Sequence, residues 1–226
     1  MLDMLLELDR SLLLFFNQGH TLYWDQVMWI YTGKLVWIPL VLSMIYVAFR
    51  GGGWREGVWF VLVAGLVVLL CDQFSSSVCK PFFERYRPAR DPDFSSMVTI
   101  VNGYRGGMFG FFSSHAANAA GIVVYTALIF RNRFYTLTAV LWALLTCYSR
   151  MYLGVHYPGD ILVGLLWGTL MGWGGFFLYK KIRLFFFGDV PSPYSGCRFV
   201  GIITTVVYLT FLFILFMAPI LNFSFH

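Results

Sequence analysis

Apolar stretches, each long enough to form a helix through much of a lipid bilayer, recur along nearly the whole chain. Of its 226 residues 59% are hydrophobic and only 12% are charged, whereas about 25% are charged in an average soluble domain. Because a bilayer core holds no water for free backbone groups, such stretches must be helices that satisfy their own hydrogen bonds. The sequence therefore predicts an all-α membrane protein, a polytopic bundle of about six transmembrane helices.

We expect these helices at the longest apolar stretches, some of which are shorter than the ~20 residues of a straight span. The expected spans are 35–49, 58–74, 116–130, 134–148, 161–179 and 200–221. In the fifth span, small residues recur that let helices approach closely: Gly164, Gly168, Gly172, Gly174 and Gly175.

The first 33 residues mix leucines with charges and carry aromatic residues such as Trp24 and Trp29, the types that collect at membrane surfaces. We expect them to form interfacial amphipathic helices; the alternative is that they cross the membrane as a seventh span. The chain is then one domain, 1–226. Its parts are interfacial helices in 1–33, a core with the active site in 35–180, and an extra C-terminal span in 199–222.

The composition also limits the ligands. The four cysteines are Cys71, Cys79, Cys147 and Cys197, and they show no close-paired spacing, so neither a disulfide framework nor a zinc site is expected. No carboxylate or histidine cluster has metal-ligand spacing, and no cofactor is expected. The net charge is +5, but the basic residues are scattered rather than forming one stripe, so we expect the bilayer and an anionic lipid as partners and not nucleic acid.

Three polar segments interrupt the apolar pattern, and they carry the candidate chemistry. Residues 80–88 read KPFFERYRP, residues 112–115 read FSSH, and residues 149–160 read SRMYLGVHYPGD. Counting the spans puts all three at the same side of the membrane, so they can meet. Charged side chains at the edge of the hydrocarbon core cost free energy, so those that occur there usually have a function.

Lys80, Arg87 and Arg150 are three cations suited to phosphate oxygens. Taken singly, Lys80 or Arg87 is more often an interfacial cation that reaches the headgroups. Ser113 is a natural N-cap for the third span, with Ser114 and His115 in its first turn, where free backbone amides favour an anion.

His156 is a candidate nucleophile, and Asp160 can hold one of its ring nitrogens so that the other is free to attack. The alternative is that His156 and Asp160 form a hydrogen-bonded pair with a structural role only. Pro158 suits the first turn of the fifth span, which would hold the carboxylate near the imidazole.

Together the ordered set Lys80…Arg87-Pro88, Ser113-Ser114-His115 and Ser149-Arg150…His156…Asp160 resembles the signature of the type 2 phosphatidic acid phosphatase family, which includes vanadium-dependent haloperoxidases. The resemblance implies a metal-independent phosphatase with a phosphohistidine intermediate. By position, the phosphoryl oxygens would be held by Lys80, Arg87, Arg150, Ser113 and the backbone of Ser114. His156 would attack phosphorus, Asp160 would orient it, and His115 would protonate the leaving oxygen. The second motif departs from the usual Pro-Ser-Gly-His, with Phe112 for proline and Ser114 for glycine.

Basic residues in short loops mark the cytoplasmic face. The side opposite the motifs holds more of them, which predicts an extracytoplasmic active site in a bacterial inner membrane.

By family association we expect undecaprenyl diphosphate as substrate, with lipid A or phosphatidylglycerol phosphate as alternatives. Two other classes are a vanadium haloperoxidase and a non-catalytic lipid-binding protein. The motifs do not specify the lipid, and the sequence leaves the oligomeric state open.

Overall fold

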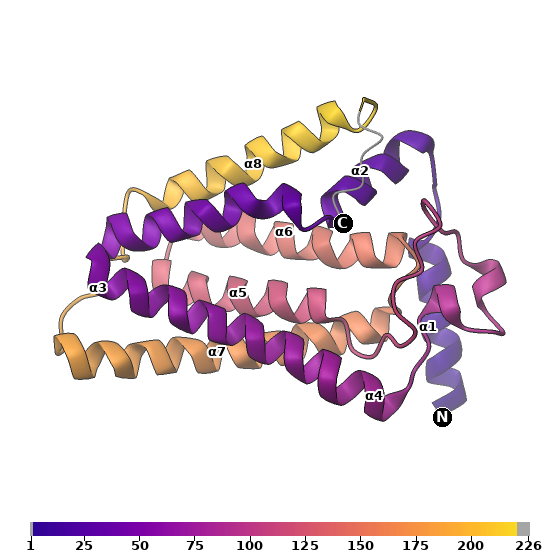
Figure 1. Ribbon diagram of the computed structural model, residues 1–226, viewed down its shortest axis with the longest axis horizontal. Coiled ribbons are helices and arrows are strands. Elements are labelled where there is room, and N and C mark those ends of the chain that lie inside the picture. The colour runs from indigo at the N-terminus through magenta and orange to yellow at the C-terminus, as the bar shows by residue number, and fades with distance from the viewer. Residues whose placement is uncertain (1, 221–226) are drawn as a thin grey trace.

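Helices form every regular element in residues 2–220, the part of the chain that this computed structural model describes. The α-helices are α1 (Leu2–Phe16), α2 (Leu22–Thr32), α3 (Ile38–Gln73), α4 (Lys80–Phe83), α5 (Ser114–Phe130), α6 (Arg133–Tyr152), α7 (Pro158–Phe187) and α8 (Val200–Met217). The long helices run along one axis of the molecule (Figure 1), and apolar side chains fill the space between them. The prediction of an all-α bundle is confirmed.

Helix α3 contains two of the expected spans. Its two arms meet at Gly53, whose φ of 71° lies in the left-handed region that favours glycine, and Figure 1 shows them as a hairpin. The side chain of Tyr194 packs against this turn and donates to the carbonyl of Ala48 at 2.8 Å. The expected span ends at residues 49 and 58, with a loop between them, are therefore wrong. The chain turns at Gly53 alone, so both arms of the helix continue almost to that residue.

Two further expected helix ends are also wrong. The second span was expected to stop at residue 74, but Phe74–Cys79 forms a π-helical turn that runs straight into α4. The fourth span was expected to stop at residue 148, but α6 continues to Tyr152. In both cases backbone hydrogen bonds carry the helix past the continuous apolar stretch that was used to place the span, so Lys80 and Arg150 project from helix ends and not from loops.

The outer limits of the last two spans differ from the prediction as well. Helix α7 extends from Pro158 to Phe187, well beyond the expected 161–179, and α8 ends at Met217. The remainder of the expected C-terminal span, 221–222, lies outside the described residues. By length and composition, three helical stretches of the described chain could cross a membrane: Leu35–Phe83, Pro158–Phe187 and Val200–Met217. The first divides at Gly53, and the total number of spans stays a prediction.

Helices α5 and α7 pack with their backbones close together. A Cβ atom on Gly168 would lie 2.1 Å from the carbonyl oxygen of Ala117, and one on Gly172 would lie 2.4 Å from that of Gly121. Gly164 approaches the carbonyl of Ser113 in the same way. These glycines bring the start of α7 against the start of α5, where two of the three motifs lie.

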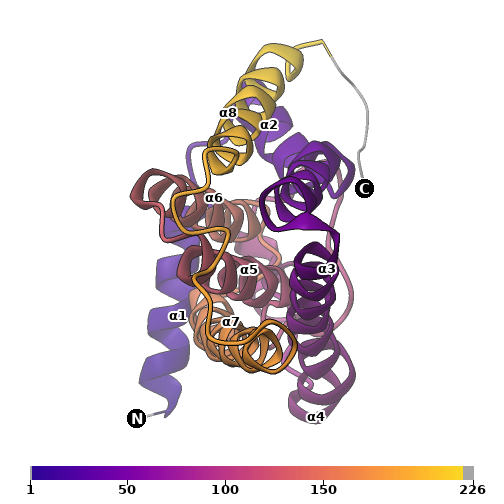
Figure 2. The same cartoon turned by 90° about the vertical axis from the view of Figure 1, so that its left-hand side faces the viewer.

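The two ends of the bundle differ. One end carries the turn of α3, the turn between α5 and α6, and the segment between α7 and α8. The other carries α4, the long 84–113 segment, the loop between α6 and α7, and α1, which lies across the bundle axis in both views (Figures 1 and 2). An orientation across the bundle suits a helix on the membrane surface, and the interfacial role of 1–33 stays a prediction.

Candidate active site

The three polar segments meet at one end of the bundle. The start of α5 and the start of α7 are joined by a hydrogen bond from the Ser113 amide to the Asp160 carbonyl at 3.0 Å. The segment after α4 is tied to the loop between α6 and α7 by a hydrogen bond from the Ala89 amide to the Gly154 carbonyl, also at 3.0 Å. Residues 112–115 and 149–160 thus form one site with the residues that follow Lys80.

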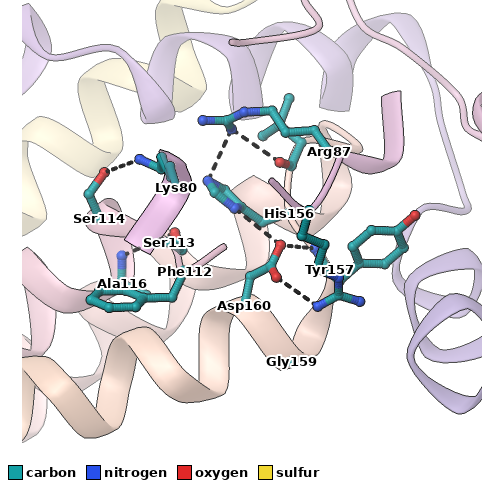
Figure 3. A network of polar contacts seen from close by, with 12 residues as sticks. Lys80, Arg87, Phe112, Ser113, Ser114, Ala116, His156, Tyr157, Gly159 and Asp160 are labelled. Carbon is teal, nitrogen blue, oxygen red and sulfur yellow. Dashed lines mark hydrogen bonds and ion pairs between the residues drawn. The ribbon is translucent and has the colours of Figure 1, made fainter. Parts of the chain in front are cut away.

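His156 lies at the centre of this site and is 1% exposed. Its Nε2 is 3.1 Å from Nη1 of Arg87, which also donates to the Val155 carbonyl (Figure 3). Because a guanidinium only donates, Nε2 must accept and carries no proton. In the neutral ring the proton is then on Nδ1, and the lone pair of Nε2 faces the cation.

Burial, and then the positive charges of Arg87 and Arg150, lower the pKa of the His156 imidazole well below its usual value. Burial and Arg150 also lower the pKa of the Arg87 guanidinium, to about 10, so Arg87 remains charged at neutral pH. The site therefore combines fixed cations with an imidazole that stays neutral.

Asp160 holds the other side of His156. Its Oδ2 is 3.5 Å from Nδ1 of His156 and accepts a hydrogen bond from the Tyr157 amide at 3.0 Å (Figure 3). The Asp160 side chain is fully buried, and its Oδ1 accepts from Arg85 at 2.8 Å. The contact to His156 is longer than a good hydrogen bond, so the carboxylate faces the ring without being closely bonded to it. Tyr157 and Pro158 cap α7 as the sequence predicts.

The second motif forms the start of α5. Ser113 is the N-cap, and its Oγ accepts from the Ala116 amide at 3.4 Å, which leaves the hydroxyl proton free to donate. Nζ of Lys80 is 3.4 Å from Oγ of Ser114. Phe112, which stands where the family usually has proline, is buried beside the stacked rings of Phe74 and Trp167.

Arg150 and His115 complete the set of predicted site residues. Arg150 is 1% exposed; its guanidinium donates to the hydroxyl of Thr32 and lies 3.5 Å from that of Tyr104. His115 is half-buried in the first turn of α5. All eight predicted residues thus lie around one end of the bundle.

Sequence reasoning missed several residues that support the site. Arg85 and Asp9 were not among the predicted site residues, yet both belong to the hydrogen-bond network of Asp160. Thr32 and Tyr104, which contact Arg150, carried no signal either. The position of Arg85 between the two motif cations was the one available clue.

A helical membrane bundle whose one end gathers three cations, two histidines and a carboxylate has the features of a membrane lipid phosphatase. Comparison with known families agrees: residues 57–184 match the model of the PAP2 superfamily, and the chain belongs to that family. The resemblance expected from the motifs is confirmed.

Individual relatives agree with this assignment. The chain is 38% identical to the lipid A 4'-phosphatase of Bacteroides thetaiotaomicron over 87% of its own length and 88% of the relative. It is 38% identical to the lipid A 4'-phosphatase of Porphyromonas gingivalis over 79% of its length and 75% of the relative. A 36% match to the undecaprenyl-diphosphatase BcrC of Bacillus subtilis covers only 36% of this chain and 37% of that protein.

A solved structure shares the fold. The crystal structure of a transmembrane PAP2-type phosphatidylglycerolphosphate phosphatase from Bacillus subtilis superposes with a TM-score of 0.59 at 24% identity, over 82% of this chain and 89% of that one. At this level of identity the likeness concerns the fold. With relatives that are phosphatases, the phosphatase prediction is confirmed over the two other classes considered.

Proposed function

We propose that the protein removes a phosphate group from lipid A, through a phosphohistidine on His156, with its active site at the outer face of a bacterial inner membrane. The arrangement of His156 carries this proposal. Arg87 contacts Nε2 at 3.1 Å, while Asp160 faces Nδ1 at 3.5 Å. A histidine held in this way has one nitrogen available to attack, beside a cation that can bind the oxygens of the group under attack.

The reaction has two steps. In the first, Nε2 of His156 attacks phosphorus, a P–N bond forms, the bond from phosphorus to the lipid oxygen breaks, and His115 gives that oxygen a proton. In the second, water attacks phosphorus, the P–N bond breaks, phosphate leaves, and His115 takes a proton from the water. Arg87 exchanges its contact with the imidazole for one with a phosphoryl oxygen as the substrate binds.

Fixed cations supply the charge stabilisation. The groups that hold the phosphoryl oxygens are Lys80, Arg87, Arg150, the Ser113 hydroxyl and the Ser114 backbone. Among the described residues, Nε of Arg87 and Nε of Arg150 are buried with no hydrogen-bond partner. Buried donors are almost always bonded, so these two support a site built to bind an anion.

The choice of lipid A rests on the relatives. Two relatives that match over 87% and 79% of this chain are named lipid A 4'-phosphatases, whereas the match to an undecaprenyl-diphosphatase covers only 36% of it. The lipid A assignment therefore replaces undecaprenyl diphosphate, the substrate expected from the motifs. A 4'-phosphate is an ester of a sugar hydroxyl, whose departing oxygen is basic and needs the proton that His115 would give.

A substrate panel tests the proposal. Purified protein in detergent is given lipid A, undecaprenyl diphosphate or phosphatidylglycerol phosphate, and released phosphate is measured alongside the mass of the lipid product. We expect the highest kcat/KM with lipid A and loss of its 4'-phosphate. A clear preference for undecaprenyl diphosphate would restore the original expectation, and no phosphate release from any lipid would contradict the proposed function.

A further inference from the structure

The carboxylate that faces His156 is one member of a closed ring of hydrogen bonds. Oδ1 of Asp160 accepts from Nη1 of Arg85 at 2.8 Å, and Nη2 of Arg85 donates to Oδ2 of Asp9 at 2.6 Å. Oδ1 of Asp9 then accepts from the amide of Gly159 at 2.7 Å, the residue next to Asp160. The ring links α1 to the first turn of α7 through a cation from the segment after α4.

Each member of this ring is held firmly. The guanidinium of Arg85 lies over the ring of Tyr157, 4.3 Å from its centroid, and the Arg85 carbonyl accepts from the Gly110 amide at 2.8 Å. The side chains of Arg85 and Asp9 are 23% and 13% exposed, so water screens the pair only in part. Gly159 has no side chain to separate the two elements: a Cβ atom there would lie 2.8 Å from Oδ2 of Asp9.

The ring has a consequence for the orientation of Asp160. Its Oδ2 faces His156 and the Tyr157 amide, and its Oδ1 is committed to Arg85. A carboxylate with one oxygen fixed cannot rotate freely, so the other oxygen stays directed at the imidazole. Without Asp9, the guanidinium of Arg85 would be hydrogen-bonded to one carboxylate only, that of Asp160, and it could turn away from it.

We propose that Asp9 and Arg85 are positioning residues for the reaction: the carboxylate of Asp9, acting through Arg85, fixes Asp160 and so the imidazole of His156. This rests on the proposed role of His156 as nucleophile. The hydrogen bonds and ion pairs of Asp9 and Arg85 go to each other, to Asp160 and to the Gly159 amide, and not to the three cations, so we expect substrate binding to change little when they are replaced. Their loss acts on kcat, because misplacement of a reacting group by about 1 Å can cost on the order of 100-fold in rate.

The neighbouring ion pair of α1 offers a matched control. Arg10 donates to Asp91 at 3.1 Å and so also ties α1 to the loops, but it has no contact with Asp160. The variants to compare are Asp9→Asn, Arg85→Ala, Gly159→Ala and, as the control, Arg10→Gln. All are purified in one detergent and checked for monodisperse elution.

The measurements are kcat and KM for phosphate release from lipid A, together with the inhibition constant of vanadate, which reports the cation site without turnover. We expect Asp9→Asn and Gly159→Ala to lower kcat roughly tenfold or more, with KM and vanadate inhibition changed less than twofold, and Arg10→Gln to retain kcat. Added guanidinium ion should restore part of the kcat of Arg85→Ala, which a merely unfolded variant would not show.

The outcomes distinguish failure of the proposed function from failure of the positioning role of Asp9 and Arg85. If wild-type protein releases no phosphate from any lipid, the proposed function fails. If wild type is active and Asp9→Asn and Gly159→Ala keep the kcat of Arg10→Gln, the positioning role is wrong. A parallel loss of vanadate inhibition in Asp9→Asn would also overturn it, since the pair would then shape the cation site itself.

Discussion

His156 is surrounded by positive charge, and this determines which of its protonation states the protein stabilises. Burial, Arg87 and Arg150 all lower the pKa of its imidazole. The ring is therefore still neutral when the pH falls to ~6.5, the usual pKa of histidine. Because its pKa is lowered, the pH must fall further before the His156 imidazole is protonated. Activity should therefore persist on the acid side of the usual histidine range.

The pH profile of Arg150→Gln tests this charge effect. Removing the guanidinium should raise the pKa of His156, so the acid limb of kcat/KM should move to higher pH than in wild type, and Arg150→Lys should keep it in place. A phosphate monoester itself ionises near pH ~6, so the shift between variants on one substrate is the quantity to measure. An unmoved acid limb in Arg150→Gln would refute the charge effect.

The two histidines should differ in their dependence on the leaving group. His156→Ala removes the attacking atom, so every substrate should lose nearly all turnover. If His115 is the general acid of the proposed mechanism, a role worth about 10²–10⁴-fold, His115→Ala should harm a lipid monophosphate far more than a diphosphate, whose leaving group is less basic. The measurement is the ratio of variant to wild-type kcat on matched prenyl mono- and diphosphates. Equal losses in His115→Ala would assign His115 to phosphate binding.

In the proposed mechanism three fixed cations neutralise the phosphoryl oxygens, so turnover should not depend on a metal ion. We expect full activity in EDTA and inhibition by vanadate, which adopts the five-coordinate geometry of the transferring group. Loss of turnover in EDTA that magnesium restores would contradict this mechanism.

At the scale of elements, the contact of α5 with α7 requires glycine at one face. Gly168→Ala places a methyl group 2.1 Å from the Ala117 carbonyl, and such overpacking costs about 1–3 kcal/mol. Gly174 lies on the same helix with nothing within 4 Å of its Cβ position, so Gly174→Ala should be neutral or slightly stabilising. Thermal unfolding can be followed with a thiol-reactive dye, because Cys71, Cys79 and Cys147 are buried. A Tm of Gly168→Ala equal to that of Gly174→Ala would show that α5 and α7 can move apart at no cost.

The apolar pattern was sufficient to predict which parts of the chain are helical, because helix formation in a bilayer depends on local composition. It could not locate the helix ends at Lys80 and Arg150, since backbone hydrogen bonding continues through polar residues beyond the continuous apolar stretch. The candidate site was found because its residues are polar against an apolar background. Asp9 and Arg85 were not, because their partner, Asp160, is brought to them only by the folded bundle.

At the scale of the whole molecule, the fold sharpens the charge difference between the two ends of the bundle. Arg183 and Glu56 form a buried ion pair at 2.9 Å, so they cancel each other. The exposed charges that remain at that end are basic apart from Asp189: Arg50, Arg55, Arg131, Arg133, Lys180, Lys181 and Arg198. At the active-site end, Arg85 and Arg10 are paired with carboxylates. The excess of free basic residues therefore lies opposite the site.

This asymmetry predicts the orientation of the protein, because basic residues in short loops stay in the cytoplasm. The turn with Arg131 and Arg133 should be cytoplasmic, and the 91–107 segment extracytoplasmic. Ser195 and Ser96 are exposed and uncharged at the two ends, so Ser195→Cys and Ser96→Cys in a variant without the four native cysteines leave the charge pattern intact. In intact cells an impermeant thiol reagent should label Ser96→Cys, and should label Ser195→Cys only after the membrane is opened. The reverse pattern would put the active site in the cytoplasm, and lipid A would then have to be dephosphorylated before it leaves the inner leaflet.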